Sequence, residues 1–156
     1  MQTINLNNAI RKVYKLKEKG KIIVFTNGCF DLLHKGHLSY LEASKELGDY
    51  FIVGLNSDSS VKKLKGEDRP VNNEMARSKN LLSTSIVDDV IIFDEDNPLK
   101  LINGILPNVL TKGGDYNEGE IIGADIVKSS GGIVEIIPLL EGYSTTKIIR
   151  DYDEKA

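Results

Sequence analysis

Short, nearly continuous apolar runs alternate with amphipathic stretches along this chain, and no other feature constrains the fold as strongly. The runs at 21–26 (KIIVFT) and 50–55 (YFIVGL) are typical of strands that are buried on both faces. Between such runs, apolar residues recur at three- and four-residue spacing, as over 5–19, where Gly20 ends a predicted helix. Strands that alternate with helices predict an α/β sandwich around a mainly parallel sheet.

The same patterns place the remaining elements. We predict helices over 36–47, 73–82 and 97–104, strands over 88–93, 109–112 and 133–137, a helical segment between the last two strands, and a last helix over 145–152 that Ser144 caps. The polar stretch 56–72 is predicted to be a loop. With 156 residues and no linker, we expect one domain, in which an N-terminal helix within 1–20 precedes a core over 21–150.

Composition and charge exclude several classes of function. The net charge of -3 gives no global basic field, so we expect neither a nucleic acid nor an anionic membrane as partner. The single cysteine, Cys29, excludes an intrachain disulfide and a zinc site built from several cysteines. The first twenty residues lack the apolar core of a signal peptide, and no run approaches the ~20 apolar residues of a membrane span. We expect a cytoplasmic protein.

The segment after the first strand, 26–37 (TNGCFDLLHKGH), carries the chemistry. A strand that passes through a Gly-containing turn into a helix start offers backbone N–H groups to a phosphate, and the helix dipole assists. His34 and His37 stand at that start, with Gly36 between them allowing close approach of a ligand. Each imidazole can donate a hydrogen bond to a triphosphate oxygen and stabilise the charge that grows as pyrophosphate leaves.

From the residues alone, this histidine pair has three interpretations. It could form a metal pair with Asp31 as third ligand, two solvated residues at a helix start, or a phosphate site. The chain has only these two histidines, and both follow the first strand of an α/β pattern. In such folds ligands bind at the carboxyl ends of the strands, so this placement favours the phosphate site.

Gly28-x-Phe30-Asp31, His34-x-Gly36-His37 and the distant Ser144-Thr145-Thr146 together resemble the HxGH nucleotidyltransferase superfamily. The resemblance implies a Rossmann-like three-layer fold and transfer of a nucleoside monophosphate from a nucleoside triphosphate. It also implies a homodimer. The hydroxyl-rich helix start at Ser144 fits independently, because it caps the backbone and can bind phosphate or ribose.

Three further stretches resemble one group of that superfamily, the adenylyltransferases of ADP-heptose synthesis. These are the segments 56–72, 111–116 and 131–146, and the likeness extends over about 21–150. It implies transfer of AMP from ATP to D-glycero-β-D-manno-heptose 1-phosphate. Cytidylyltransferases of the superfamily carry an arginine just before the E-G-x-S-T-T stretch, where this chain has Pro138-Leu139-Leu140-Glu141. Its absence removes a charge-assisted contact to the nucleotide and argues against a cytidylyl enzyme.

The predicted site follows from the motifs and the resemblance. The predicted catalytic residues are His34, His37, Lys65 and Arg77. The predicted nucleotide-binding residues are Thr26, Asn27, Gly28, Cys29, Phe30, Gly36, Asn56, Arg69, Ser144, Thr145 and Thr146. The predicted acceptor-binding residues are Asp31, Lys112, Gly113, Gly114 and Asp115. Mg²⁺ is expected to arrive with ATP and to be held by the phosphates, with no metal site in the protein.

Several of these assignments carry their own expectation. Lys62, Lys63, Lys65 and Arg69 are expected in one basic loop that closes over phosphates. Arg77 is a phosphate ligand only through the resemblance; without it, Arg77 reads as a surface residue of a helix. Asp31 is expected to cap the turn, and Cys29 to be a small buried residue rather than a reactive thiol.

Two alternatives stay open at this point. One is a nucleotidyltransferase of the same superfamily that uses CTP or GTP, or another acceptor such as glycerol 3-phosphate. The other is a nucleotide-binding module without turnover, against which the intact pair His34 and His37 argues.

Overall fold

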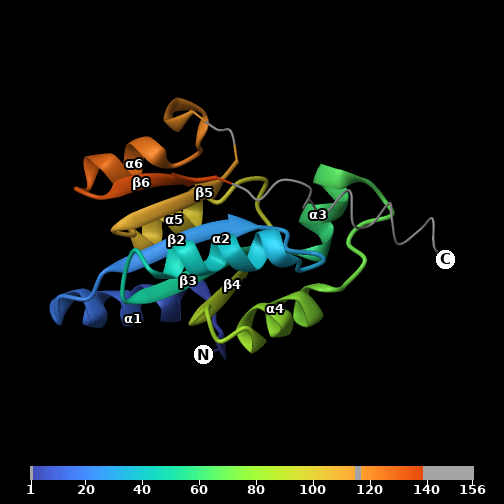
Figure 1. Ribbon diagram of the computed structural model, residues 1–156, viewed down its shortest axis with the longest axis horizontal. Coiled ribbons are helices and arrows are strands. Elements are labelled where there is room, and N and C mark those ends of the chain that lie inside the picture. The colour runs from blue at the N-terminus through green and yellow to red at the C-terminus, as the bar shows by residue number, and fades with distance from the viewer. Residues whose placement is uncertain (1, 115–116, 139–156) are drawn as a thin grey trace.

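In this computed structural model, which describes residues 2–114 and 117–138, all strands belong to one parallel sheet (Figure 1). The sheet has six strands in the order β1-β4-β3-β2-β5-β6. Their bounds are β1 Gln2–Thr3, β2 Ile23–Gly28, β3 Tyr50–Asn56, β4 Asp89–Phe93, β5 Val109–Gly113 and β6 Ile133–Ile137. The predicted α/β fold with a parallel sheet is confirmed.

The strand order reverses between β2 and β5. From β2 the chain builds the sheet outward through β3 and β4, and then crosses back to add β5 and β6 on the other side. In open α/β sheets the loops diverge at such a switch point and leave a crevice at the carboxyl ends of the two strands. The fold therefore directs attention to the residues after Gly28 and Gly113.

Helices cover both faces of the sheet (Figure 1). The helices are α1 Leu6–Glu18, α2 Lys35–Lys45, α3 Asp58–Lys65, α4 Glu74–Ser83, α5 Leu99–Ile105 and α6 Ala124–Ser129, with a short 3₁₀ helix, η1 Glu118–Glu120. Side chains of α1, α5 and α6 share one apolar core with the sheet, and those of α2 and α4 share the other. Helix α3 stands at the carboxyl end of β3.

The amino-terminal segment is part of this architecture. Ala9 and Val13 of α1 are buried in the first core. Lys12 of the same helix forms an ion pair of 2.9 Å with Asp89, a fully buried residue at the start of β4. Residues 2–18 therefore pack on the sheet and extend it by one short strand.

Most predicted elements are found within a few residues of their expected bounds, and the strand 133–137 is found as predicted. Three features differ from the expectations. β1 has only two residues, too few to show a pattern, and was not predicted. The stretch 56–72 is not all loop, because 58–65 forms α3. The helix expected over 97–104 begins at Leu99 as α5, with Pro98 as its N-cap. Ser144 and the predicted helix 145–152 lie outside the described residues.

Within the described ranges 2–114 and 117–138, none of the helices has the length and apolar character needed to cross a membrane.

Candidate functional site

The two histidines lie against each other at the start of α2. His34 is the N-cap, and its Nδ1 accepts a hydrogen bond of 3.3 Å from the backbone N–H of His37. The rings are stacked, with centroids 3.9 Å apart and planes 22° apart. On its other side, His37 bonds through Nδ1 to the carbonyl oxygen of Leu32 at 3.0 Å. The backbone of the first turn of α2 thus orients the His34 ring, and the backbone of the turn before the helix orients the His37 ring.

The surroundings keep both rings uncharged. Burial, with smaller contributions from the neighbouring His34 and Lys65, lowers the pKa of His37 to about 4, although the hydrogen bond to the Leu32 carbonyl acts in the opposite direction. Burial also lowers the pKa of His34. Near neutral pH, both histidines of the free protein are thus imidazoles.

Phe30 supports the histidines from the turn. Its backbone has a positive φ of 45°, and its buried ring packs against that of His37 in an edge-to-face arrangement, with centroids 5.5 Å and planes 63° apart. A Cβ on Gly28 would approach Cε2 of this ring to 2.8 Å. Gly28 therefore leaves the room that Phe30 needs in order to brace His37.

Asp31 fastens the turn to the segment before α4. It is 1% exposed, and its Oδ2 and Oδ1 accept the backbone N–H groups of Val71 and Asn72 at 2.7 and 2.8 Å. The side-chain amide of Asn72 in turn donates to the Asp31 carbonyl oxygen at 2.8 Å. The carboxylate of Asp31 thus caps backbone N–H groups of the segment before α4, and not those of its own turn as expected. Contact of Asp31 with an acceptor stays a prediction.

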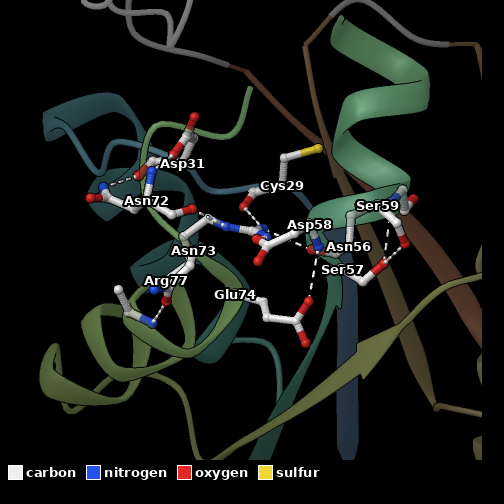
Figure 2. Close-up of polar contacts among 12 residues, drawn as sticks. Cys29, Asp31, Asn56, Ser57, Asp58, Ser59, Asn72, Asn73, Glu74 and Arg77 are labelled. Carbon is white, nitrogen blue, oxygen red and sulfur yellow. Dashed lines mark hydrogen bonds and ion pairs between the residues drawn. The ribbon is translucent and has the colours of Figure 1, made fainter. Parts of the chain in front are cut away.

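Arg77 is the centre of a polar network that joins four segments (Figure 2). The residue is fully buried in α4, which the expectation of a surface residue did not foresee. Its Nε donates to the carbonyl of Asn72, and its Nη1 donates to the carbonyls of Cys29 and Asn56. Its Nη2 forms an ion pair of 2.8 Å with Asp58. In this structure Arg77 positions the ends of β2 and β3 and does not itself face an open site.

A second hydrogen bond links α3 to α4, and here α3 supplies the donor and α4 the acceptor (Figure 2). The carboxylate of Glu74, the first residue of α4, accepts the backbone N–H of Asp58, the first residue of α3, at 3.0 Å. Arg77 and Glu74 together hold the first turn of α3. Sequence reasoning missed this helix and both roles, although Ser57 as N-cap and Gly66 as C-cap were visible signals.

The expected basic loop is in part a helix. Lys62, Lys63 and Lys65 lie in the last turn of α3, where cations also complement the helix dipole. The charge of Lys65 adds to the burial that lowers the pKa of His37, and it offsets part of the burial that raises the pKa of Cys29, so this lysine lies near the site. Arg69 follows in the loop, and its Nη1 is buried with no hydrogen-bond partner among the described residues.

Lys112 reaches the site from β5, across the switch point from β2. It is partly buried, and burial lowers its pKa. It lines a cavity of about 180 Å³ with Asn27, the residue before the end of β2, and with Glu120. Gly113 ends the strand, and Gly114 follows with a positive φ of 100° that disfavours any side chain.

Two predicted nucleotide ligands have buried side chains in this structure. Thr26 is fully buried, and its hydroxyl donates to the carbonyl of Thr111 at 3.0 Å. Asn56 is 5% exposed, and its amide donates to Ser60 at 2.9 Å. The polar atoms of both side chains thus form hydrogen bonds within the protein: Thr26 links β2 to β5, and Asn56 links the end of β3 to α3.

The remaining predicted residues divide into two groups. Cys29 lies in the turn and Gly36 in the first turn of α2. Cys29 is partly buried and not fully buried as expected, and this burial raises the pKa of its thiol. Asp115 and the run Ser144, Thr145 and Thr146 lie outside the described residues. The structure brings together the histidines, Phe30, Lys65 and Lys112 at one edge of the sheet.

Comparison with known proteins gives a family for this arrangement. The cytidylyltransferase-like family model matches residues 25–151. The chain is 56% identical over 140 residues to the bifunctional protein HldE of Campylobacter jejuni subsp. doylei, covering 90% of this chain and 30% of that protein. It is 49% identical over 147 residues to the bifunctional protein HldE of Syntrophotalea carbinolica, covering 94% of this chain and again 30% of the relative. The chain thus spans about a third of the length of these relatives.

Solved structures agree with the fold. The lipopolysaccharide core biosynthesis protein of Thermoplasma volcanium superposes with a TM-score of 0.63 at 30% identity, covering 80% of this chain and 100% of that chain. A pantoate-beta-alanine ligase of Francisella tularensis gives a TM-score of 0.63 at 15% identity over 98% of this chain and 77% of that one. The second likeness concerns the fold alone.

Proposed function

The chain belongs to the cytidylyltransferase-like family, and we propose that it is an adenylyltransferase that transfers AMP from ATP to D-glycero-β-D-manno-heptose 1-phosphate. The products are ADP-heptose and pyrophosphate. The observation that carries the proposal is the stacked pair His34 and His37 at the start of α2, beside Lys65 and across the switch point from Lys112. Such an arrangement suits two phosphorylated substrates that react with each other.

The reaction needs no nucleophile from the protein. A phosphate oxygen of the sugar 1-phosphate attacks the α-phosphorus of ATP, the new P–O bond forms, and the bond to the β-phosphate oxygen breaks as pyrophosphate leaves. His34 and His37 donate hydrogen bonds to the phosphate oxygens on which charge grows. Because the backbone N–H of His37 and the Leu32 carbonyl fix the two rings beforehand, little reorganisation is required during transfer.

Cationic side chains then neutralise the phosphates. Lys65 lies close enough to His37 for its charge to act on the pKa of that ring. Arg69 has a buried Nη1 that has no hydrogen-bond partner among the described residues, and such a donor is suited to an anion. Lys112 lines the cavity at the switch point with Asn27, and we assign it to the phosphate of the acceptor. Arg77 acts through Asp58 and the loop carbonyls as a positioning residue.

Magnesium enters the proposal with the nucleotide. In the described part of the chain, no group of three or more His, Cys, Asp or Glu side chains could hold a metal ion. The cationic site is instead suited to a triphosphate that carries Mg²⁺ on its own oxygens. The ion would supply charge neutralisation for the leaving pyrophosphate.

The choice of ATP and of a heptose acceptor rests on the relatives and on the sequence. Relatives of about half identical sequence carry the name HldE, and a structural relative is a lipopolysaccharide core biosynthesis protein. The arginine expected of a cytidylyl enzyme before Glu141 is absent. We further propose that the protein works in the cytoplasm as a homodimer, which sedimentation of the purified chain tests.

A panel of substrates tests the proposal. ATP, CTP and GTP are each combined with Mg²⁺ and with heptose 1-phosphate or glycerol 3-phosphate, and the release of pyrophosphate is followed. We expect release with ATP and the β-heptose 1-phosphate. Release with CTP and glycerol 3-phosphate would instead assign a cytidylyltransferase, and ATP binding without release from any acceptor would assign a nucleotide-binding module.

A further inference from the structure

The hydrogen bonds of the two histidines fix different protonation states. Nδ1 of His34 lies 3.3 Å from the backbone nitrogen of His37. A backbone N–H can only donate, so this Nδ1 must present its lone pair. The neutral His34 ring therefore carries its one proton on Nε2.

His37 has the opposite tautomer. Its Nδ1 lies 3.0 Å from the carbonyl oxygen of Leu32. A carbonyl oxygen can only accept, so this Nδ1 must carry a proton. The neutral His37 ring therefore presents a lone pair, not a proton, on Nε2.

This difference matters for binding a phosphate through Nε2. His34 can donate from Nε2 in its neutral form. His37 can donate from Nε2 only after that atom gains a proton and the ring becomes an imidazolium. In the free protein the ring is neutral near pH 7, because burial lowers the pKa of His37 to about 4. Among the described residues, the titratable groups that act on the pKa of His37 are His34, the N-cap of the same helix, and Lys65 on α3.

We propose that His37 takes up one proton on Nε2 when a nucleoside triphosphate binds, while His34 donates from Nε2 as a neutral imidazole. The proton comes from solvent, remains on His37 while the triphosphate is bound, and returns to solvent once pyrophosphate has left. This inference rests on the proposed function, because it needs a polyanion at the histidines.

Two physical effects support a single proton for the pair. A triphosphate beside His37 favours the charged ring, since opposite charge within a few ångströms stabilises an imidazolium. The stacked rings, with centroids only 3.9 Å apart, disfavour two adjacent cations. One imidazolium and one neutral donor therefore form the preferred state with the nucleotide bound.

The pH dependence of binding follows by linkage. Between the pKa of His37 in the free protein and its higher pKa in the complex, each unit of rising pH weakens ATP binding up to tenfold. The neutral donor His34 adds no such dependence.

The imidazole ¹⁵N spectrum of the full chain tests the proposal directly, because the chain has only two histidines. In the free protein at pH 7 we expect one ring protonated on Nε2 and one protonated on Nδ1, assigned with a His34→Gln variant. With saturating MgATP and no acceptor, the His37 ring should show both nitrogens protonated while His34 is unchanged. Two neutral rings in the ATP complex would overturn the inference.

Calorimetry in two buffers of different ionisation enthalpy provides the second measurement. We expect the wild-type protein to take up a proton when MgATP binds at pH 7, and a His37→Gln variant to bind MgATP without uptake. Binding and turnover by the wild type without uptake would overturn only this inference. Failure of MgATP to bind the folded wild-type protein would overturn the proposed function as well.

Discussion

Arg77 and Asp58 join the two helices behind the candidate site, with Nη2 of the arginine 2.8 Å from Oδ1 of the aspartate. The arginine is fully buried, while 34% of the aspartate side chain is exposed. The same guanidinium holds the carbonyl oxygens of Cys29 and Asn56, at the ends of β2 and β3. One side chain thus sets the position of the turn before the histidines relative to the helix that carries Lys65.

Replacing Arg77 by lysine should therefore impair both stability and turnover. A single ammonium cannot reproduce a planar fork with several directed donors, and the carbonyls of Cys29, Asn56 and Asn72 would lose their partner. We expect the free energy of unfolding to fall by about 3 kcal/mol. Urea denaturation measures the loss, and Lys79→Arg, on an exposed position of the same helix, is the control that should stay near wild type. An unchanged midpoint for Arg77→Lys would contradict the positioning role.

The stability of the protein should fall as the solution is acidified below about pH 6.5. Burial lowers the pKa of His37 to about 4, whereas the unfolded chain binds this proton at the ordinary value of 6.5. Between these two values the unfolded state holds more protons than the folded one, so stability rises with pH, by at most about 1.4 kcal/mol per unit. Urea midpoints from pH 4.5 to 7 measure the slope. The His37→Gln variant should show a shallower slope, and an equal slope would remove His37 as its source.

Lys65 and Lys63 form a matched pair on α3. The charge of Lys65 lowers the pKa of His37, so Lys65→Met should raise that pKa. NMR titration of the imidazole measures it. Lys63→Met removes the same charge from the same helical turn and should leave the pKa close to that of the wild type. Equal effects of the two substitutions would mean that Lys65 has no specific position beside His37.

Lys112 should act on the acceptor more than on ATP. The side chain lines the cavity between the ends of β2 and β5, where we place the sugar phosphate. Loss of a charge-assisted bond to phosphate corresponds to about 1.5–3 kcal/mol, or roughly 10- to 150-fold in the KM of the acceptor. Steady-state kinetics of Lys112→Ala, with each substrate varied in turn, measures both KM values. A rise in the KM for ATP alone would move Lys112 to the nucleotide side.

The sequence patterns predicted most of the fold, because buried parallel strands appear as short apolar runs and amphipathic helices as apolar residues at three- and four-residue spacing. The strand 133–137 and the helix start at His34 illustrate this. β1 left no trace because it has two residues and is formed by pairing with β4. Helix α3 shows no clear apolar periodicity, because Val61 and Leu64 are the only apolar residues of a polar run. Its caps, Ser57 and Gly66, are the signals that indicate a helix there.

The sequence indicated which residues gather at the site, but it did not indicate the role of each one. The helix-start histidines and the turn Gly28 to Asp31 followed from local geometry. The burial of Arg77 did not, because its partners Cys29, Asn56 and Asp58 are 48, 21 and 19 residues away along the chain. The tautomers of His34 and His37 likewise depend on backbone atoms that only the folded turn brings within reach.

The central claim is that this site transfers AMP from ATP to a sugar 1-phosphate. ³¹P NMR of a reaction that contains the purified chain, MgATP and D-glycero-β-D-manno-heptose 1-phosphate tests it most directly. We predict that the monoester signal of the sugar phosphate is replaced by the two coupled signals of a pyrophosphate diester, and that one pyrophosphate is released for each sugar phosphate consumed. His37→Gln should slow this conversion by about 10²–10³-fold. Persistence of the sugar phosphate signal with the folded wild-type protein, or its conversion at an equal rate by His37→Gln, would contradict the account.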